Sequence, residues 1–352
     1  MKKICIISPA NLKYVPYVQN YLDFLRNNNC TFDIVSWNKS NLNEDVKYHM
    51  DYYVEDTNRF RMLCGYLRFG RFCRKIIKRN KYAKLVFLTI APLFFCGKKI
   101  SKKYKGKYIL DIRDSSPLIK AFPKTFHSLL NNSFIVISSS WMFSSWIKHD
   151  FVLSHNVDIK HLLNHYNDSV ICHYHKTKRI VFAGMMIEEK INIKLLDCFK
   201  NSDDLSFLYV GRDNAGKAKI VEYVKSNGFD NVAFEGTYNK NEIIDIYRTK
   251  ADFVNILREK TEINRNAIPN KLYDSVVSGV PLIVFDHNEG ISRVTKEYNL
   301  GIVLGENDFL SLRDLLESFD YQLYKNGRKR FLDSVLKDDE KFKNELSKFI
   351  DV

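Results

Sequence analysis

Two glycines and a lysine stand at a phosphate-binding spacing in residues 207–223, FLYVGRDNAGKAKIVEY. Gly211, Gly216 and Lys217 nearly reproduce the P-loop, in which backbone amides cradle phosphates, the lysine reaches the outer phosphates and a following hydroxyl holds Mg²⁺. The hydroxyl position is Ala218, which has no oxygen to offer. A plain strand–loop–helix turn is therefore favoured over a nucleotide hydrolase.

A second candidate site lies in NAIPNKLYDSVVSGVPLIVF, residues 266–285. Pro269 suits a helix start, because it lacks an N–H that would be unsatisfied there. The free amides and dipole of a helix N-terminus attract a diphosphate, and Lys271 adds a full positive charge. Asp274, one turn on, is placed to accept hydrogen bonds from ribose hydroxyls. The same spacing also fits an ordinary surface helix with an i,i+3 ion pair.

These candidates belong to a chain of 352 residues, for which two domains are expected. Seven cysteines occur without a Cys-x-x-Cys pair, which indicates reduced, cytosolic thiols. The apolar run after Lys3 is too short for a signal peptide. The longest apolar stretch, 85–96, contains Pro92 and is too short to cross a bilayer. We therefore expect a soluble or peripheral protein.

The positive charge is concentrated in the first half of the chain. Residues 1–172 hold 27 Lys and Arg against 12 Asp and Glu, whereas residues 173–352 hold 28 against 29. Between Thr57 and Leu110 there are 16 Lys and Arg and no acidic residue. This asymmetry predicts that one half meets an anionic partner, such as a membrane surface, a nucleic acid or a phosphorylated substrate.

Short apolar strands alternate with helical stretches along the whole chain, which predicts parallel sheets covered on both faces. The expected strands are 3–8, 32–37, 84–90, 107–112 and 134–139 in the first half, and 179–184, 205–211, 231–236, 251–256, 281–286 and 301–305 in the second. Helices are expected at 239–248, 270–278 and 338–350. The fold class predicted is α/β, with two tandem Rossmann-like domains whose parallel sheets face a central cleft.

The domain limits follow from this pattern. We expect an N-terminal Rossmann-like domain at 1–165, a hinge at 166–178 and a C-terminal Rossmann-like domain at 179–335. The last helix, 336–352, is expected to pack back toward the N-terminal domain. Ligands of open α/β sheets bind beyond the carboxyl ends of the strands, so each domain would hold one substrate.

At this point the sequence resembles a known family. PNKLYDSVVSGVPLIVFD is similar to the signature region of family-4 glycosyltransferases of the GT-B fold. Residues 179–199, LSFLYVGRD, and the segment from Asn231 to Leu257 follow in the order expected of the family's donor domain. KGKYILDIRDSSP and residues 133–158 look like late acceptor-domain strands. The resemblance is most specific over 179–305.

The resemblance and the spacing together predict which residues form the site. The family's second donor-site acid corresponds to Asp274, its first to the uncharged Asn266, and its Arg after the first donor-domain glycine to Met185. Donor binding is expected from Gly184, Lys190, Arg212, Asn270, Lys271, Tyr273 and Asp274. Catalytic roles are expected for Arg113, which corresponds to a family His, and Asp114. Ser8 and Asn11 are expected on the acceptor side or in a loop of the cleft, where they could contact donor or acceptor.

The resemblance also implies how the reaction is supported. This fold usually stabilises the leaving diphosphate with cations and backbone amides, so no metal or cofactor is expected besides a UDP- or GDP-linked co-substrate. The sequence contains no Asp-x-Asp, the metal-holding motif of the other large sugar-transferase fold. His161 and His165 stand four apart in a His-rich hinge with His173 and His175, without ligands that complete a metal site.

Residues 59–79, RFRMLCGYLRFGRFCRKIIKR, predict an amphipathic helix with basic and apolar sides, interrupted at Gly70. Its apolar side fits a domain core. The excess charge favours docking at the cytoplasmic membrane, near a lipid-linked acceptor. Nucleic acid is not expected, because the sequence shows no RRM, zinc-finger or helix-turn-helix pattern.

The sequence therefore predicts a cytoplasmic hexosyltransferase, peripheral at the inner face of the membrane. It would transfer a sugar from a nucleotide sugar to a saccharide or lipid-linked oligosaccharide acceptor. Metal independence, retention and a role in bacterial surface polysaccharide synthesis are what the resemblance implies. The alternatives are a P-loop-like nucleotidase or ATPase, and a non-catalytic nucleotide-sugar or polyanion-binding protein.

Overall fold

A computed structural model describes residues 3–54, 59–169, 177–305 and 307–351. The chain divides into two compact units, residues 1–159 with 335–352, and residues 160–334. The expected limits at 165 and 335 lie within six residues of this division. Most of the expected hinge at 166–178, including His173 and His175, lies outside the described residues.

The first unit is built on a seven-stranded parallel sheet in the order β3-β2-β1-β4-β5-β6-β7. Each strand expected from the sequence is present. Two short strands that carry no apolar run were not expected, β3, which pairs with β2, and β7, which pairs with β6. The strands are β1 (Ile4–Ser8), β2 (Phe32–Asn38), β3 (Tyr48–Asp51), β4 (Lys84–Leu88), β5 (Tyr108–Ile112), β6 (Ile135–Ser138) and β7 (Val152–Leu153).

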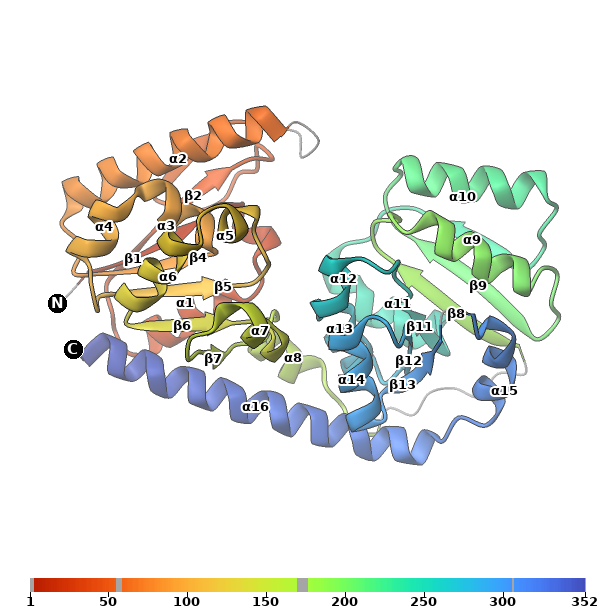
Figure 1. Ribbon diagram of the computed structural model, residues 1–352. Coiled ribbons are helices and arrows are strands. Elements are labelled where there is room, and N and C mark those ends of the chain that lie inside the picture. The colour runs from red at the N-terminus through yellow and green to blue at the C-terminus, as the bar shows by residue number, and fades with distance from the viewer. Residues whose placement is uncertain (1–2, 55–58, 170–176, 306, 352) are drawn as a thin grey trace. The chain divides into compact units, whose positions relative to one another are not determined.

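Helices cover both faces of this sheet (Figure 1). One face packs against α2, α3, α4 and α6, the other against α1 and the end of α16, where Phe342 and Phe349 are buried. The helices are α1 (Val18–Asn27), α2 (Arg59–Asn80), α3 (Ile90–Cys96), α4 (Lys98–Lys103), α5 (Pro117–Ala121), α6 (Pro123–Asn132), α7 (Ser144–Ile147), α8 (Ile159–His165) and α16 (Tyr321–Asp351). Residues 335–352 of the chain thus belong to the first unit.

The helix predicted at 59–79 is α2, and Gly70 does not interrupt it. Gly70 instead allows α2 to pack closely on α3, because a Cβ there would lie 2.4 Å from the carbonyl oxygen of Phe95. Gly65 does the same beside the ring of Trp37. Within the described part of the chain, no helix combines the length and the apolar character that crossing a bilayer requires.

The second unit holds a six-stranded parallel sheet in the order β10-β9-β8-β11-β12-β13. Its strands are β8 (Lys178–Ala183), β9 (Leu205–Val210), β10 (Val232–Glu235), β11 (Phe253–Asn255), β12 (Leu282–Phe285) and β13 (Gly301–Leu304). Its helices are α9 (Glu189–Cys198), α10 (Ala215–Ser226), α11 (Ile243–Lys250), α12 (Glu262–Asn266), α13 (Lys271–Ser278), α14 (Glu289–Tyr298) and α15 (Leu312–Glu317), with the start of α16. The predicted α/β class with two Rossmann-like units is confirmed.

Candidate functional site

The strand order of the second unit predicts where a ligand would bind. The chain runs outward from β8 through β9 to β10, then crosses back to β11 and continues to β13 on the other side. In such sheets ligands bind outside the carboxyl ends of the strands where the order reverses, here between β8 and β11. Gly184 follows β8 and Arg258 follows β11, so both lie at this point.

Lys271, the first residue of α13, brings its ammonium group to the same place. Its Nζ lies 3.9 Å from the centroid of the Phe182 ring, in a cation–π contact. Gly184 has φ of +130°, a conformation that side chains rarely adopt, and a Cβ there would lie 3.4 Å from Nζ. The glycine therefore keeps the space beside the ammonium group free of a side chain.

The buried carboxylate of Glu188 acts electrostatically on this cation. Glu188 accepts hydrogen bonds from the amide of Glu259 at 3.0 Å and from Nδ2 of Asn264 at 3.1 Å. Arg258 donates to Oδ1 of the same Asn264 at 3.3 Å. Glu188 thus fixes the loop after β11, which carries Arg258, and its charge opposes the effect of burial on the pKa of both Arg258 and Lys271.

Burial dominates the electrostatics of the two cations. It lowers the pKa of Lys271 to about 7, with the positive charge of Arg258 as the second cause. Burial also lowers the pKa of Arg258. Two neighbouring cations that lack full hydration and share one buried carboxylate form a site that an anion would stabilise.

Asp274 and Tyr238 add hydrogen-bonding groups to this cationic site. Burial raises the pKa of Asp274 to about 6, although Lys240 and Lys271 pull it down. The Tyr238 hydroxyl lies 4.0 Å from the position that a Cβ on Gly184 would take, and burial together with the charge of Asp274 raises its pKa to about 12. A carboxylate and a phenol beside two cations suit a ligand that carries both phosphate and hydroxyl groups.

The backbone at the start of α13 contributes less than the sequence suggests. The amide of Leu272 donates to the carbonyl of Pro269, and the amide of Tyr273 donates to the carbonyl of Asn270. These bonds use amides that a helix N-terminus usually leaves free. This turn therefore presents the charged side chain of Lys271 and not a row of open helix amides.

The other expected donor residues differ in their exposure and contacts. Tyr273 is 1% exposed and packs against Phe331, so it has no surface for a ligand. Lys190 is exposed on α9, and Arg212 is exposed with its guanidinium against the sulfur of Met185. Asn270 caps α13, and its Oδ1 is buried without a hydrogen-bond partner among the described residues.

The P-loop-like segment is explained by packing. Lys217 is buried, and its ammonium group donates to the carbonyls of Gly211 and Glu235, both at 2.9 Å, and pairs with Asp213. Gly211 and Gly216 permit close backbone contacts, because a Cβ would overlap the carbonyl oxygens of Gly184 and Met186, respectively. The lysine thus ties β9 to β10 and does not extend toward a phosphate.

In the first unit, Arg113 is a buried structural residue. Its Nε lies 2.5 Å from one carboxylate oxygen of Asp111 and its Nη2 lies 2.6 Å from the other. It also donates to the carbonyl of Ser154, and its guanidinium stacks 3.7 Å from the ring centroid of Tyr17. Arg113 is 5% exposed, so little of its side chain is open to a substrate. Asp114, next in sequence, is exposed.

Ser8 bonds within its own loop, and Asn11 bonds the segment at the end of β2. Ser8 is fully buried and donates to the carbonyl of Ala10. Asn11 is 1% exposed, donates to the side chain of Asn38 at 2.7 Å, and accepts two amide hydrogen bonds through its own Oδ1. These side chains shape the loop after β1 and do not present themselves to an acceptor.

Metal-binding side chains do not gather in the described ranges, where no group of three or more His, Cys, Asp or Glu residues is close enough to hold an ion. The rings of His161 and His165 lie 4.2 Å apart, and His165 Nδ1 bonds the His161 carbonyl. His287 is partly buried against Phe285 and bonds the carbonyl of Arg258, so it supports the same loop.

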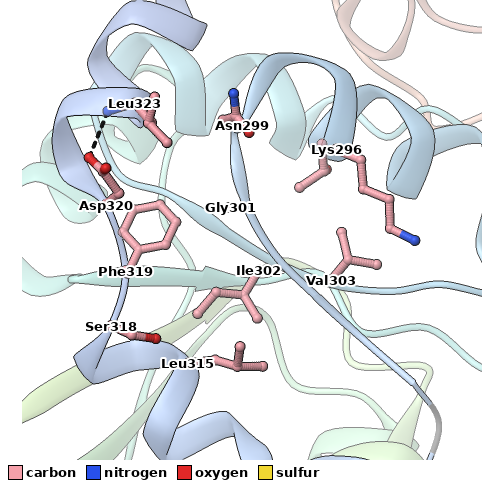
Figure 2. A pocket seen from close by; sticks show the side chains of 11 residues that line it. Lys296, Asn299, Gly301, Ile302, Val303, Leu315, Ser318, Phe319, Asp320 and Leu323 are labelled. Carbon is pink, nitrogen blue, oxygen red and sulfur yellow. Dashed lines mark hydrogen bonds between the residues drawn. The ribbon is translucent and has the colours of Figure 1, made fainter.

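A cavity of about 360 Å³ lies elsewhere in the second unit, beside β13 at the edge of the sheet. Figure 2 shows Ile302, Leu315, Phe319 and Leu323 around it, with Asp320 bonded to the amide of Leu323. None of the residues expected in the donor site is among the described residues that line it. This cavity is therefore separate from the Lys271 group.

Sequence reasoning did not find Glu188, Tyr238 or Arg258. Each lies among other polar residues a few positions after a strand, where charged residues are common. Arg258 was the most accessible signal, because it is the first charged side chain after the expected strand at 251–256. Arg258 lies near Gly184 because β11 is next to β8 in the sheet, and only the strand order shows that these two strands are neighbours.

Comparison with solved structures identifies the class of fold. A glycosyltransferase from Rickettsia africae superposes with a TM-score of 0.70 at 13% identity, covering 99% of both chains. The lipopolysaccharide outer core galactosyltransferase WaaB gives 0.64 at 12% identity, covering 98% of this chain and 99% of the other. A UDP-GlcNAc 2-epimerase from Methanocaldococcus jannaschii gives 0.56 at 13% identity, covering 94% and 98%.

The likeness extends over nearly the whole chain in each case, and at these identities it establishes the fold. The protein has the GT-B fold that the sequence resemblance implied. No protein-family model and no curated protein sequence matches the chain.

Proposed function

We propose that the protein is a glycosyltransferase that moves a sugar from a UDP- or GDP-linked donor to a saccharide or lipid-linked saccharide acceptor. The observation that carries the proposal is the pair of partly dehydrated cations, Lys271 and Arg258, at the strand-order reversal of the second unit. A diphosphate would replace the hydration that these cations have lost, which favours its binding there.

The same group suits the chemistry of transfer. As the bond between the sugar and the diphosphate breaks, negative charge grows on the leaving phosphate oxygen. Fixed cations stabilise that charge more than the ground state, which lowers the barrier. Lys271 and Arg258 would do this without a metal, and Asp274 and Tyr238 would bond sugar or ribose hydroxyls. We further propose that the sugar is transferred with retention of configuration.

The basic first unit is proposed to hold the acceptor. The side chain of Arg113 is held in an ion pair with Asp111. Asp114, which is exposed after β5, is therefore our candidate for the acceptor-side carboxylate. We also propose that the protein works at the cytoplasmic face of the membrane in bacterial surface polysaccharide synthesis. The excess of cations in the first half of the chain supports that placement.

A two-stage experiment tests the proposal. Calorimetric titration with UDP-, GDP- and adenine-nucleotide ligands comes first, on the wild type, Lys271→Met and a matched control, Lys225→Met, an exposed lysine on α10. We expect uridine or guanosine diphosphates to bind, the Lys271 variant to lose affinity at least tenfold, and the control to match the wild type. Equal affinity in all three proteins would remove Lys271 from the donor site.

The second stage separates a transferase from the alternatives. The protein is incubated with a mixture of nucleotide sugars, with and without a lipid-linked saccharide fraction, and the nucleotide products are read by mass spectrometry. Release of the diphosphate that rises with the acceptor supports transfer. Nucleotide release equal in both samples would indicate a hydrolase or an epimerase-type elimination, and binding without turnover would indicate a non-catalytic binder.

A further inference from the structure

The first two turns of α2 present an apolar surface to solvent. Phe60 is 75% exposed, Leu63 is 49% exposed and Leu67 is 44% exposed. At spacings of three and four residues, these side chains lie along one side of the helix. Large apolar side chains that are exposed together on one element mark an interaction site more often than single exposed ones do.

Packing within the first unit does not account for these three residues. The side chains that hold α2 on the sheet lie on its opposite side, where Phe69 and Cys73 are fully buried and Ile76 is 6% exposed. The helix therefore has two apolar surfaces. One surface packs in the core and the other is exposed. The amphipathic pattern of the sequence alone does not tell the two apart.

The outward side of α2 becomes cationic beyond Leu67. Arg71, Lys75 and Lys78 are exposed along it at helical spacing, and Arg61 and Arg68 are exposed beside the apolar turns. Between Thr57 and Leu110 the chain has no carboxylate that would neutralise this charge from within the same segment.

A row of partly buried aromatic rings connects α2 to a second exposed apolar residue, Phe122. Phe122, between α5 and α6, is 49% exposed and lies 5.2 Å from the ring of Phe94. Phe94 lies 5.4 Å from Phe95, which stacks at 5.5 Å on Tyr66 of α2. Exposed lysines flank Phe122 on both sides, Lys120 and Lys124.

We propose that Phe60, Leu63, Leu67 and Phe122, with their flanking cations, form a docking surface for the anionic leaflet of a bilayer. The apolar side chains would enter the boundary between headgroups and acyl chains, and the Lys and Arg side chains would meet lipid phosphates. A nucleic acid would use the cations but not the exposed leucines, so the combination favours lipid. The inference rests on the proposed function only for the choice of the cytoplasmic leaflet.

Vesicle flotation with the full chain tests this surface without measuring activity. The vesicles are phosphatidylcholine alone, or phosphatidylcholine mixed with phosphatidylglycerol. The apolar variant is Leu63→Gln with Leu67→Gln, and its control is Leu310→Gln with Leu323→Gln, two exposed leucines of the second unit. Circular dichroism and thermal melting confirm that each variant folds.

We expect the wild type to float with the anionic vesicles only. The apolar variant should bind on the order of tenfold more weakly, because two leucines no longer enter the bilayer, whereas its control should match the wild type. Replacing Lys75 and Lys78 with Gln should weaken binding roughly fivefold for each cation removed, and added salt should reduce these differences.

Three results would overturn the proposal. The first is equal recovery with neutral and anionic vesicles. The second is unchanged binding of a folded Leu63 and Leu67 variant. The third is a dimer in light scattering that dissociates in that variant, which would assign the surface to a second copy of the chain. Because no nucleotide sugar is present, failure here leaves the donor-site proposal standing, and failure of donor binding leaves this one standing.

Discussion

The pKa of Lys271 makes donor affinity depend on pH in a defined direction. Burial and the charge of Arg258 lower that pKa to about 7 in the ligand-free protein. A bound diphosphate supplies negative charge next to Nζ and raises the pKa again, so the ligand prefers the protonated lysine. The diphosphate of a nucleotide sugar stays fully ionised near neutral pH, so the ligand itself adds no titration. Affinity should therefore fall as pH rises through 7.

The size of the effect follows from the protonated fraction. With a pKa of about 7, roughly three-quarters of the lysine is protonated near pH 6.5 and about 3% near pH 8.5. If the bound state keeps its proton throughout, the apparent Kd rises roughly twentyfold over this interval, or about 1.8 kcal/mol. Proton uptake on binding should accompany the change and be largest at the alkaline end.

Calorimetric titration of UDP- and GDP-linked sugars in buffers of different ionisation enthalpy measures both quantities. Lys271→Arg is the matched control, because a guanidinium stays charged over the whole range and should flatten the pH dependence while keeping affinity. Lys271→Met should bind weakly at every pH. A wild-type affinity that stays constant, or that increases with pH, would refute the reasoning, since the ligand would then not depend on this ammonium group.

The other predictions concern groups with a defined partner or a defined exposure. Asp274, whose pKa burial raises to about 6, should lose its acceptor role as pH falls. Its loss of charge alone lowers affinity about tenfold between about pH 7 and pH 5, and the fuller protonation of Lys271 offsets about twofold of this, so wild-type affinity drops about fivefold, whereas Asp274→Asn binds weakly and shows no such drop. Arg113→Met leaves the Asp111 carboxylate buried and unpaired and should cost about 3–5 kcal/mol in urea unfolding, against less than about 0.5 kcal/mol for the exposed Asp114→Asn. Lys217→Met should lower the melting temperature but leave nucleotide-sugar affinity unchanged; a selective loss of ATP binding would restore the P-loop interpretation.

The sequence determined the elements and the class of fold. Buried parallel strands are continuous apolar runs, so their positions are visible without a structure, and each expected strand is present. The short strands β3 (Tyr48–Asp51) and β7 (Val152–Leu153) were not predicted, because neither contains a long apolar run. Both are strands because they pair with a neighbouring strand. A strand defined by its partner leaves little local signal.

The candidate site likewise contains residues that the sequence predicted and residues that only the structure revealed. Lys271, Asp274 and Gly184 could be named from the chain, because a proline-initiated helix and a glycine after a strand are local signals. Local spacing also made Lys217 look like a functional group, and the family resemblance did the same for Arg113. The structure shows both lysine and arginine satisfied by carbonyls and carboxylates, a fact about neighbours that spacing does not contain.

What the sequence by itself determined is therefore the order of strands along the chain, the helix that carries Lys271, and the uneven charge of the two halves. Only the tertiary structure decided which strands are neighbours, and with that which cations share one buried carboxylate. Glu188, Arg258 and Lys271 are far apart in sequence, and long-range sheet pairing brings them together. Burial then sets their pKa values, because desolvation depends on everything packed around a group and not on its own place in the chain.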